Sequence, residues 1–187
     1  LATYGNQGDI IRFYEINPEV VRFAEKYFTY LSDARDRGAE IELVAGDARL
    51  SMERESFAGS QRYDLLILDA FTGDAIPNHL LTKEAFDIYL THLAEGGAIA
   101  VHVSNRYLNL PIIGYGLAEH FGLDAAQIEN RSAGFHSTSS ATWILLSRNE
   151  ELLRELRWHA VTFDEDDFPE KLPLWTDHRH NLFEILE

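Results

Sequence analysis

The segment YDLLILDA, residues 63–70, decides the fold of this chain. Its continuous apolar run is typical of a strand that a parallel sheet buries on both faces. Asp69 follows directly at the end of the run, and a second acid, Asp74, lies in the next loop between Gly73 and Pro77. The segment therefore predicts a buried strand that presents carboxylates at its carboxyl end.

Strand signals recur along the chain and alternate with helical patterns. They predict strands at residues 10–16, 41–48, 98–103, 124–130 and 141–148, and helices from Asn17 and over 79–93, 111–121 and 151–158. Strands separated by helices indicate an α/β fold with a doubly wound, mostly parallel Rossmann-like sheet. The last two strands are joined by a loop without a helical pattern, so we expect them to form an antiparallel edge. Residues 1–158 are predicted to be one domain on which a tail, 159–187, packs, with Thr176 or Asp177 capping a short final helix.

The first predicted strand ends in an acid, Glu15, and a helix opens at Asn17 with Pro18 in its first turn. In a nucleotide-binding sheet, an acid at this place takes the ribose hydroxyls and lies about 20 residues beyond a glycine-rich loop. Counting back from Glu15 by that distance runs off the start of the sequence. We therefore expect this chain to lack the first strand and its glycine-rich loop. The alternative is a fold that never had such a loop.

The charge of the chain favours a cationic ligand. Thirty-one acids against sixteen bases give a formal net charge of -15. Such a surface repels phosphate backbones, so nucleic acid is not an expected partner. It attracts a small cation, although an acidic surface also serves solubility alone.

Two absences in the sequence concern location. The chain contains no cysteine, which excludes disulfides and thiolate metal sites and fits a reducing compartment. No apolar run approaches the roughly 18 residues of a membrane span. We expect a cytoplasmic protein.

Three consecutive predicted strands end in acids, namely Glu15, Asp47 and Asp69. A single acid at a strand end is usually a turn or cap residue. Ligands of open α/β sheets bind beyond the carboxyl ends of the strands, however, and three acids there favour a ligand site.

Five segments in this order resemble the successive motifs of spermidine synthases, the polyamine aminopropyltransferases: FYEINPEVV, AGDAR, YDLLILDAF, LTKEAF and LAEGGAIAVHVSN. The resemblance runs from about residue 10 to 148 and implies the fold of class I S-adenosylmethionine-dependent methyltransferases. HVSNRYLNL with a closing WTD…NL…L is similar to a branch of spermidine synthase-like proteins, some of which are fused to membrane segments.

The resemblance also implies roles for the matching residues. Glu15, followed by Ile16, holds the ribose of the sulfonium co-substrate, and Asp47 receives the adenine amino group beside the Ala48 backbone. Asp69 takes the place of the catalytic aspartate and borders the co-substrate.

On the amine side, Asp74 takes the place of the second loop acid, and Asn105 and Asp177 lie in the motifs assigned to substrate binding. No metal is implied. The pattern departs from the family here, because DAFTGDAIP displaces the second acid by two positions. His102–Asn105 also replace a region that commonly holds a glutamine, and His136–Ser140 replace a segment with a tyrosine.

The resemblance implies transfer of an aminopropyl group from decarboxylated S-adenosylmethionine to a small cationic amine. An alkylammonium must lose a proton before it attacks carbon, and a nearby carboxylate both binds it and accepts that proton. Two alternatives stay open: a methyltransferase that uses intact S-adenosylmethionine, and a noncatalytic binding domain with the same fold. A homodimer, and a longer chain with membrane segments, also stay open.

Overall fold

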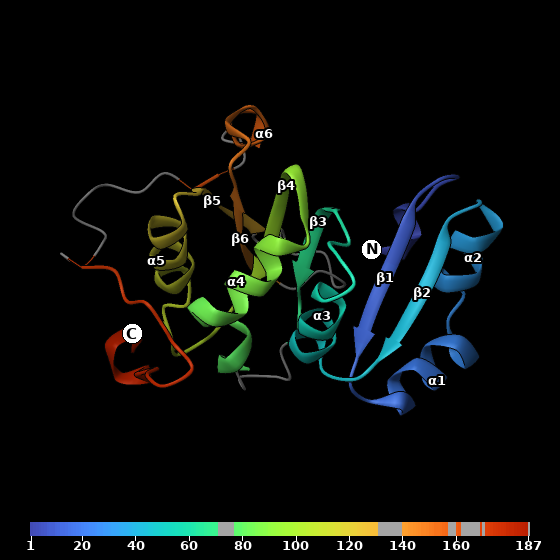
Figure 1. Cartoon of the computed structure of the whole chain (residues 1–187), viewed down its shortest axis with the longest axis horizontal. Helices are drawn as coiled ribbons and strands as arrows, with labels where there is room; N and C mark the ends of the chain where they lie inside the picture. Colours follow the sequence, from blue (N-terminus) through green and yellow to red (C-terminus); the bar gives the residue numbers. More distant parts are fainter. Residues whose placement is uncertain (71–76, 131–139, 157–159, 162–168, 170, 187) are drawn as a thin grey trace. The chain divides into compact units, whose positions relative to one another are not determined.

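A computed structural model describes residues 1–70, 77–130, 140–156, 160–161, 169 and 171–186. The chain divides into two compact units, Leu1–Ala58 and Gly59–Glu187 (Figure 1). Asp74 and residues 136–139 lie outside the described residues. In the described part, none of the helices is long and apolar enough to cross a membrane.

The first unit is built on two parallel strands that pair in register, with Ile11 opposite Ile41 and Glu15 opposite Ala45. Its elements in chain order are η1 (Ala2–Tyr4), β1 (Ile10–Glu15), α1 (Pro18–Tyr27), α2 (Tyr30–Asp36), β2 (Glu40–Ala45) and α3 (Ala48–Ser56). Strands β1 and β2 thus have their carboxyl ends at the same edge of the pair.

Helices pack on both faces of this strand pair. Successive side chains of a strand point to opposite sides, so each face has its own set of contacts. On one face, Ile11 and Phe13 pack against a buried cluster that includes Leu31 and Ala34 of α2. On the other face, Arg12 forms an ion pair with Glu55 of α3 at 3.2 Å, and the Tyr14 hydroxyl donates to the same carboxylate at 2.6 Å. The doubly wound arrangement predicted from the sequence is therefore present in this unit.

The second unit contains a four-stranded sheet in the order β3-β4-β6-β5. Its elements are β3 (Tyr63–Leu68), η2 (Asn78–Leu80), α4 (Lys83–Thr91), β4 (Leu93–His102), α5 (Pro111–Phe121), β5 (Asp124–Asn130), β6 (Ala141–Ser147), α6 (Glu150–Leu156) and η4 (Leu182–Ile185). Strand β3 pairs with β4 in parallel, whereas β6 runs antiparallel to both β4 and β5. The expected antiparallel edge is confirmed, and so is the α/β fold class.

Strand β4 begins five residues earlier than the predicted strand, at Leu93 instead of Ala98. Tyr63 is opposite Leu93 and Leu65 is opposite Ala98, so β4 bulges between the two pairs. Gly96 in the bulge has a φ of 76°, and a Cβ on Gly97 would lie 2.7 Å from the Tyr63 carbonyl oxygen. The two glycines therefore lie in a bulge within β4, just before the predicted start of the strand at Ala98.

Helix prediction was accurate for α5 and less so elsewhere. The single helix expected from Asn17 is divided into α1 and α2, because the chain is extended at Phe28. Helix α3 was not predicted. The final helical turn is η4, whose cap is Asn181 and not Thr176 or Asp177.

Residues 171–186 of the tail pack on the rest of the second unit. The Lys83 backbone N–H donates to the carbonyl of Trp175 at 2.8 Å, and the Asn109 N–H donates to the carbonyl of Ile185 at 2.8 Å. The Trp175 side chain is only 1% exposed. A Cβ at Gly116 of α5 would lie 2.1 Å from the Pro173 carbonyl oxygen, so this close approach requires glycine.

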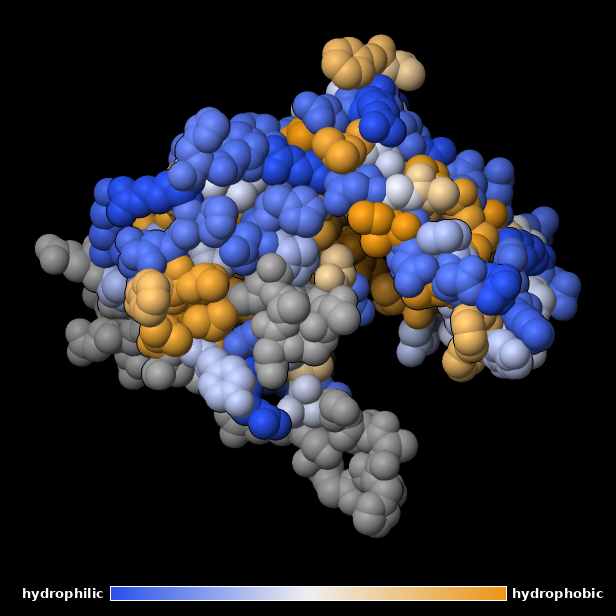
Figure 2. All heavy atoms as spheres, turned by 90° about the horizontal axis from the view of Figure 1, so that it is seen from below, coloured by the Kyte–Doolittle hydropathy of each residue, from blue (hydrophilic) through white to orange (hydrophobic). Residues whose placement is uncertain are grey.

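Apolar side chains also reach the surface, where they appear as orange areas in Figure 2. In the first unit they include Val20 and Phe23 of α1. In the second unit Leu65 of β3 is 49% exposed, although the sequence predicted burial of β3 on both faces. Leu66 and Leu68 of the same strand are buried as expected.

Trp175 tests how strongly the tail stabilises the second unit. Trp175→Ala removes a fully buried aromatic side chain and is expected to lower the free energy of unfolding by ~3–5 kcal/mol. The matched control is Phe183→Ala in the same tail, because Phe183 is 82% exposed and its loss should change stability by less than about 0.5 kcal/mol. Urea unfolding followed by fluorescence measures both, and equal losses would contradict the role of Trp175 as the anchor.

Candidate functional site

The carboxyl edge of the β1–β2 pair brings two of the predicted cofactor acids together. Glu15 is the last residue of β1, and its backbone carbonyl accepts the N–H of Gly46 at 3.0 Å. Gly46 has a φ of 132°, a conformation that favours glycine. The chain turns there, so that Asp47 follows at the same edge.

Glu15 has a local structural partner. Its Oε1 accepts the backbone N–H of Asn17 at 2.8 Å, while the Asn17 side chain caps α1 by accepting the N–H of Glu19 at 3.0 Å. The Glu15 residue is half-buried, and Ile16 beside it is 70% exposed. A carboxylate held by one backbone N–H keeps acceptor capacity for the hydroxyl groups of a ligand.

Asp47 is the N-cap of α3. Its Oδ1 accepts the N–H of Leu50 at 2.9 Å, and α3 begins at the next residue, Ala48. Both residues are half-buried. The turn and cap roles of Glu15 and Asp47 are the ordinary ones for acids at strand ends, and they hold both side chains at this edge of the strand pair.

Asp69 follows β3 in the second unit and is hydrogen-bonded to a histidine. His102 ends β4, the parallel neighbour of β3, so the two residues lie at the same edge of this sheet. The His102 Nδ1 lies 2.9 Å from Asp69 Oδ1, and its Nε2 lies 2.7 Å from the Ser104 hydroxyl oxygen. The Asp69 side chain remains 53% exposed.

The sequence pattern indicates no role for His102, which stands in the segment His102–Asn105 that departs from the family pattern. The signal that would have found the pair is positional, because Asp69 and His102 each come at the end of a predicted strand. Only the parallel pairing of those two strands makes them neighbours.

The residues predicted on the amine side have local partners in the second unit. The Asn105 Oδ1 accepts the backbone N–H groups of Tyr107 and Leu108 at 2.9 and 3.0 Å. Asp177 Oδ1 accepts the Thr82 hydroxyl at 2.9 Å, and the Asp177 N–H donates to Glu84 at 2.9 Å. These contacts order a loop and the tail, and the role of both residues in substrate binding stays a prediction.

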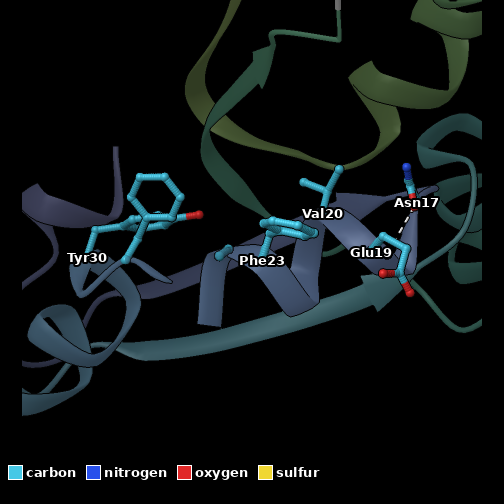
Figure 3. Close-up of a pocket in the computed structure, with 7 residues that line it drawn as sticks. Asn17, Glu19, Val20, Phe23 and Tyr30 are labelled. Atoms are coloured by element: carbon cyan, nitrogen blue, oxygen red, sulfur yellow. Dashed lines mark hydrogen bonds between the residues drawn. The ribbon is translucent and has the colours of Figure 1, made fainter. Parts of the chain in front are cut away.

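A pocket of 460 Å³ lies in the first unit, and it is mainly apolar. Figure 3 shows Val20 and Phe23 on the same side of α1, with Tyr30 of α2 beyond them. The residues that line it are Asn17, Glu19, Val20, Phe23, Ala24, Phe28 and Tyr30. None of the predicted site residues lines this pocket.

Two further observations bear on the chemistry. Burial raises the pKa of Tyr115 on α5 to about 12, so its phenol stays protonated near neutral pH. Among the residues that the structure describes, no three or more His, Cys, Asp or Glu side chains gather in a group suited to a metal ion.

Solved structures similar to this chain define the fold class. The spermidine synthase from Thermotoga maritima matches 89% of this chain and 54% of its own with a TM-score of 0.58 and 15% identity. A spermidine synthase in complex with the transition state analogue AdoDATO matches 89% of this chain and 53% of its own with a TM-score of 0.54 and 16% identity. At these identities the likeness shows the fold, which is Rossmann-like and of the class I methyltransferase type.

Sequence similarity is narrower but points to the same proteins. A polyamine aminopropyltransferase from Vibrio vulnificus (strain CMCP6) is 41% identical over 70 residues, which are 37% of this chain and 21% of that relative. No family model matches the chain. The resemblance to the spermidine synthase-like family that the motifs predicted is confirmed, while the chain spans about a fifth of that relative and about half of the matched structures.

Asp47 permits a test that separates the effect of the helix cap from the effect of the carboxylate charge. Asp47→Ala removes the cap of α3 and is expected to cost ~0.5–2 kcal/mol in the free energy of unfolding, whereas Asp47→Asn keeps a cap of similar strength. Thermal and urea unfolding of the two variants measure this difference. An equal loss for both would show that the carboxylate charge, and not the cap, stabilises this turn.

Proposed function

We propose that this chain is the nucleoside- and amine-handling part of a spermidine synthase-like transferase. The reaction moves an aminopropyl group from decarboxylated S-adenosylmethionine to an amine acceptor. The observation that carries the proposal is the exposed carboxylate of Asp69 at the carboxyl end of β3. The motif set from residue 10 to 148 and the 41% identical stretch support it.

In this proposal Glu15 accepts hydrogen bonds from the ribose hydroxyls, and Asp47 with the Ala48 backbone receives the adenine. The half-buried position of these residues beside α1 and α3 supports an ordered nucleoside site at this edge. Asp74 and Asp177 supply charge for the far end of a diamine. The formal net charge of -15 supports attraction of a cationic acceptor.

Asp69 acts on the near ammonium of the acceptor. The carboxylate first binds the ammonium and then takes one of its protons, which frees the nitrogen lone pair. The nitrogen forms a bond to the propyl carbon beside the sulfonium, the carbon–sulfur bond breaks, and its electron pair returns to sulfur. A neutral thioether nucleoside leaves, and the positive charge moves to the new secondary ammonium. Alignment of nitrogen, carbon and sulfur supplies further acceleration.

Calorimetric titration decides which co-substrate the chain accepts. The protein is titrated with decarboxylated and intact S-adenosylmethionine, and with methylthioadenosine and S-adenosylhomocysteine. We expect tighter binding of the decarboxylated form. This form keeps the ammonium group but has lost the carboxylate, which an acidic site repels. Preference for the intact form assigns a methyltransferase, and binding without turnover of any amine assigns a noncatalytic domain.

Glu15 gives the first mutational test. Glu15→Gln keeps the shape but removes the charge that strengthens two ribose hydrogen bonds, so methylthioadenosine affinity should fall at least ~10-fold. Glu40→Gln is the matched control, since Glu40 is an exposed acid at the opposite end of the same strand pair. Unchanged nucleoside binding by Glu15→Gln would show that the ribose lies elsewhere.

Asp69 gives the second test. Asp69→Asn matches the carboxylate in size but cannot accept the proton, so kcat should fall by ~10²–10⁴ while the melting temperature and most nucleoside affinity persist. Asp64→Asn, an exposed acid near the start of the same strand, is the control. A lower melting temperature with near-normal turnover per folded molecule would reduce Asp69 to a turn residue.

A further inference from the structure

Three side chains and one backbone group form a continuous hydrogen-bonded chain that ends at Asp69. The Thr142 N–H donates to the Ser104 hydroxyl oxygen at 2.7 Å. That oxygen lies 2.7 Å from His102 Nε2, and His102 Nδ1 lies 2.9 Å from Asp69 Oδ1. The carboxylate is therefore linked through an imidazole to the backbone of β6.

The strand arrangement also places an aromatic ring against the imidazole. His102 is opposite Trp143 in the β4–β6 ladder, and their rings stack with centroids 4.8 Å apart and an interplanar angle of 21°. The His102 side chain is 23% exposed, against 53% for Asp69. A half-buried ring thus holds an exposed carboxylate.

The network also selects a tautomer. With the Thr142 N–H on one lone pair of the Ser104 oxygen, the serine proton is free to donate to His102 Nε2. Nδ1 of the neutral ring then carries the hydrogen and donates it to Asp69 Oδ1. This arrangement engages one carboxylate oxygen and leaves Oδ2 to meet a ligand.

We infer that His102 is a positioning residue for Asp69, an inference that rests on the proposed function. Its Nδ1–H holds Oδ1, so that Oδ2 faces the ammonium and receives its proton in a fixed direction. Ser104 and Trp143 act through His102, because they fix the tautomer and the plane of the ring. A carboxylate without this partner would rotate about its side-chain torsions and spend less time in the reactive geometry.

The connectivity of Asp69, His102 and Ser104 is also that of a hydrolytic triad. The backbone N–H of Thr142 points at the serine oxygen itself, whereas an oxyanion hole needs donors aimed at the oxygen of a bound carbonyl. We therefore infer that the hydrogen-bonded chain holds Asp69 in place. Ester hydrolysis is one of the outcomes that the experiments below distinguish.

Two substitutions at His102 separate the hydrogen bond from the ring. His102→Leu removes the donor and should lower kcat about 10-fold or more, with little change in the apparent KM for the nucleoside co-substrate. His102→Asn places an amide N–H near the position of Nδ1 and should recover most of kcat. A purely structural role predicts instead that both variants lose activity in proportion to the fraction unfolded, which melting curves report.

The control is His120→Leu, which should keep wild-type kcat. His120 is an exposed residue in the last turn of α5. The strand that follows α5 begins with Asp124 opposite Ser147, which is in turn opposite Ala98, four residues before His102 in β4. His120 therefore lies before the amino end of β5, whereas His102 lies at the carboxyl end of β4. The two strands run in the same direction, because both are antiparallel to β6.

A double-mutant cycle tests the coupling. If His102 acts through Asp69, then His102→Leu should add little to the loss caused by Asp69→Asn. Multiplicative losses in the double variant, or full activity of folded His102→Leu, would overturn the inference while leaving the transferase proposal intact. Hydrolysis of p-nitrophenyl acetate that disappears in Ser104→Ala would overturn it in favour of a hydrolytic triad.

Nitrogen-15 NMR of the histidine rings gives a readout that needs no turnover. The inference predicts the Nδ1–H tautomer for His102 in the wild type and a loss of that preference in Asp69→Ala. If the tautomer is present but no amine is alkylated, the proposed function fails and the pairing stands. If the wild-type ring prefers Nε2–H, the inference fails whatever the activity.

Discussion

Parallel pairing of β3 with β4 is the constraint on which the proposed chemistry depends. Buried strands must satisfy every backbone N–H and C=O in a ladder, and that ladder fixes which residues end up side by side. Here Leu68 is opposite Val101, so the next residue of each strand, Asp69 and His102, emerges at the same edge. A one-residue slip would turn the side chains of a strand to its other face and break the pair. The apolar residues of β3 and β4 therefore set the geometry of the two polar groups that follow them.

The same constraint operates in the first unit, where Glu15 and the Gly46–Asp47 turn follow parallel neighbours. Both acids have ordinary local roles, one in a turn and one as a helix cap. Such roles do not compete with ligand binding. A carboxylate that is already held by a backbone N–H has lost its rotamer freedom on folding, so less entropy remains to be lost when a ligand binds. The observed structural roles of these strand-end acids and their proposed binding roles are thus compatible with one geometry.

Most of the fold could be predicted because buried strands leave a strong apolar signal, as in residues 63–68 and 141–147. Helix α3 was missed because its sequence, ARLSMERES, carries few apolar residues. Its N-cap, Asp47, also lies within the predicted strand 41–48. The start of β4 was missed because Gly96 and Gly97 favour a turn, whereas pairing with Tyr63 draws Leu93 into the sheet. In the site, Glu15, Asp47 and Asp69 were visible as acids at the ends of predicted strands. The link from Asp69 to His102 was not, because it depends on the pairing of strands that are distant in sequence.

The exposure of Asp69 fits the proton balance of the proposed reaction. An alkylammonium with a pKa of ~10.4 carries its proton at pH 7. Because this pKa lies about 3.4 units above the pH, releasing the proton to bulk water costs ~4.6 kcal/mol. Transfer to a carboxylate, which is a much weaker base than an amine, would cost more than this if the proton stayed there. The lower cost applies only if the acceptor passes its proton on to solvent. With 53% of its side chain exposed, Asp69 is open to solvent while His102 holds one oxygen in place. A fully buried carboxylate would hold the amine as well but would lack that exit for the proton.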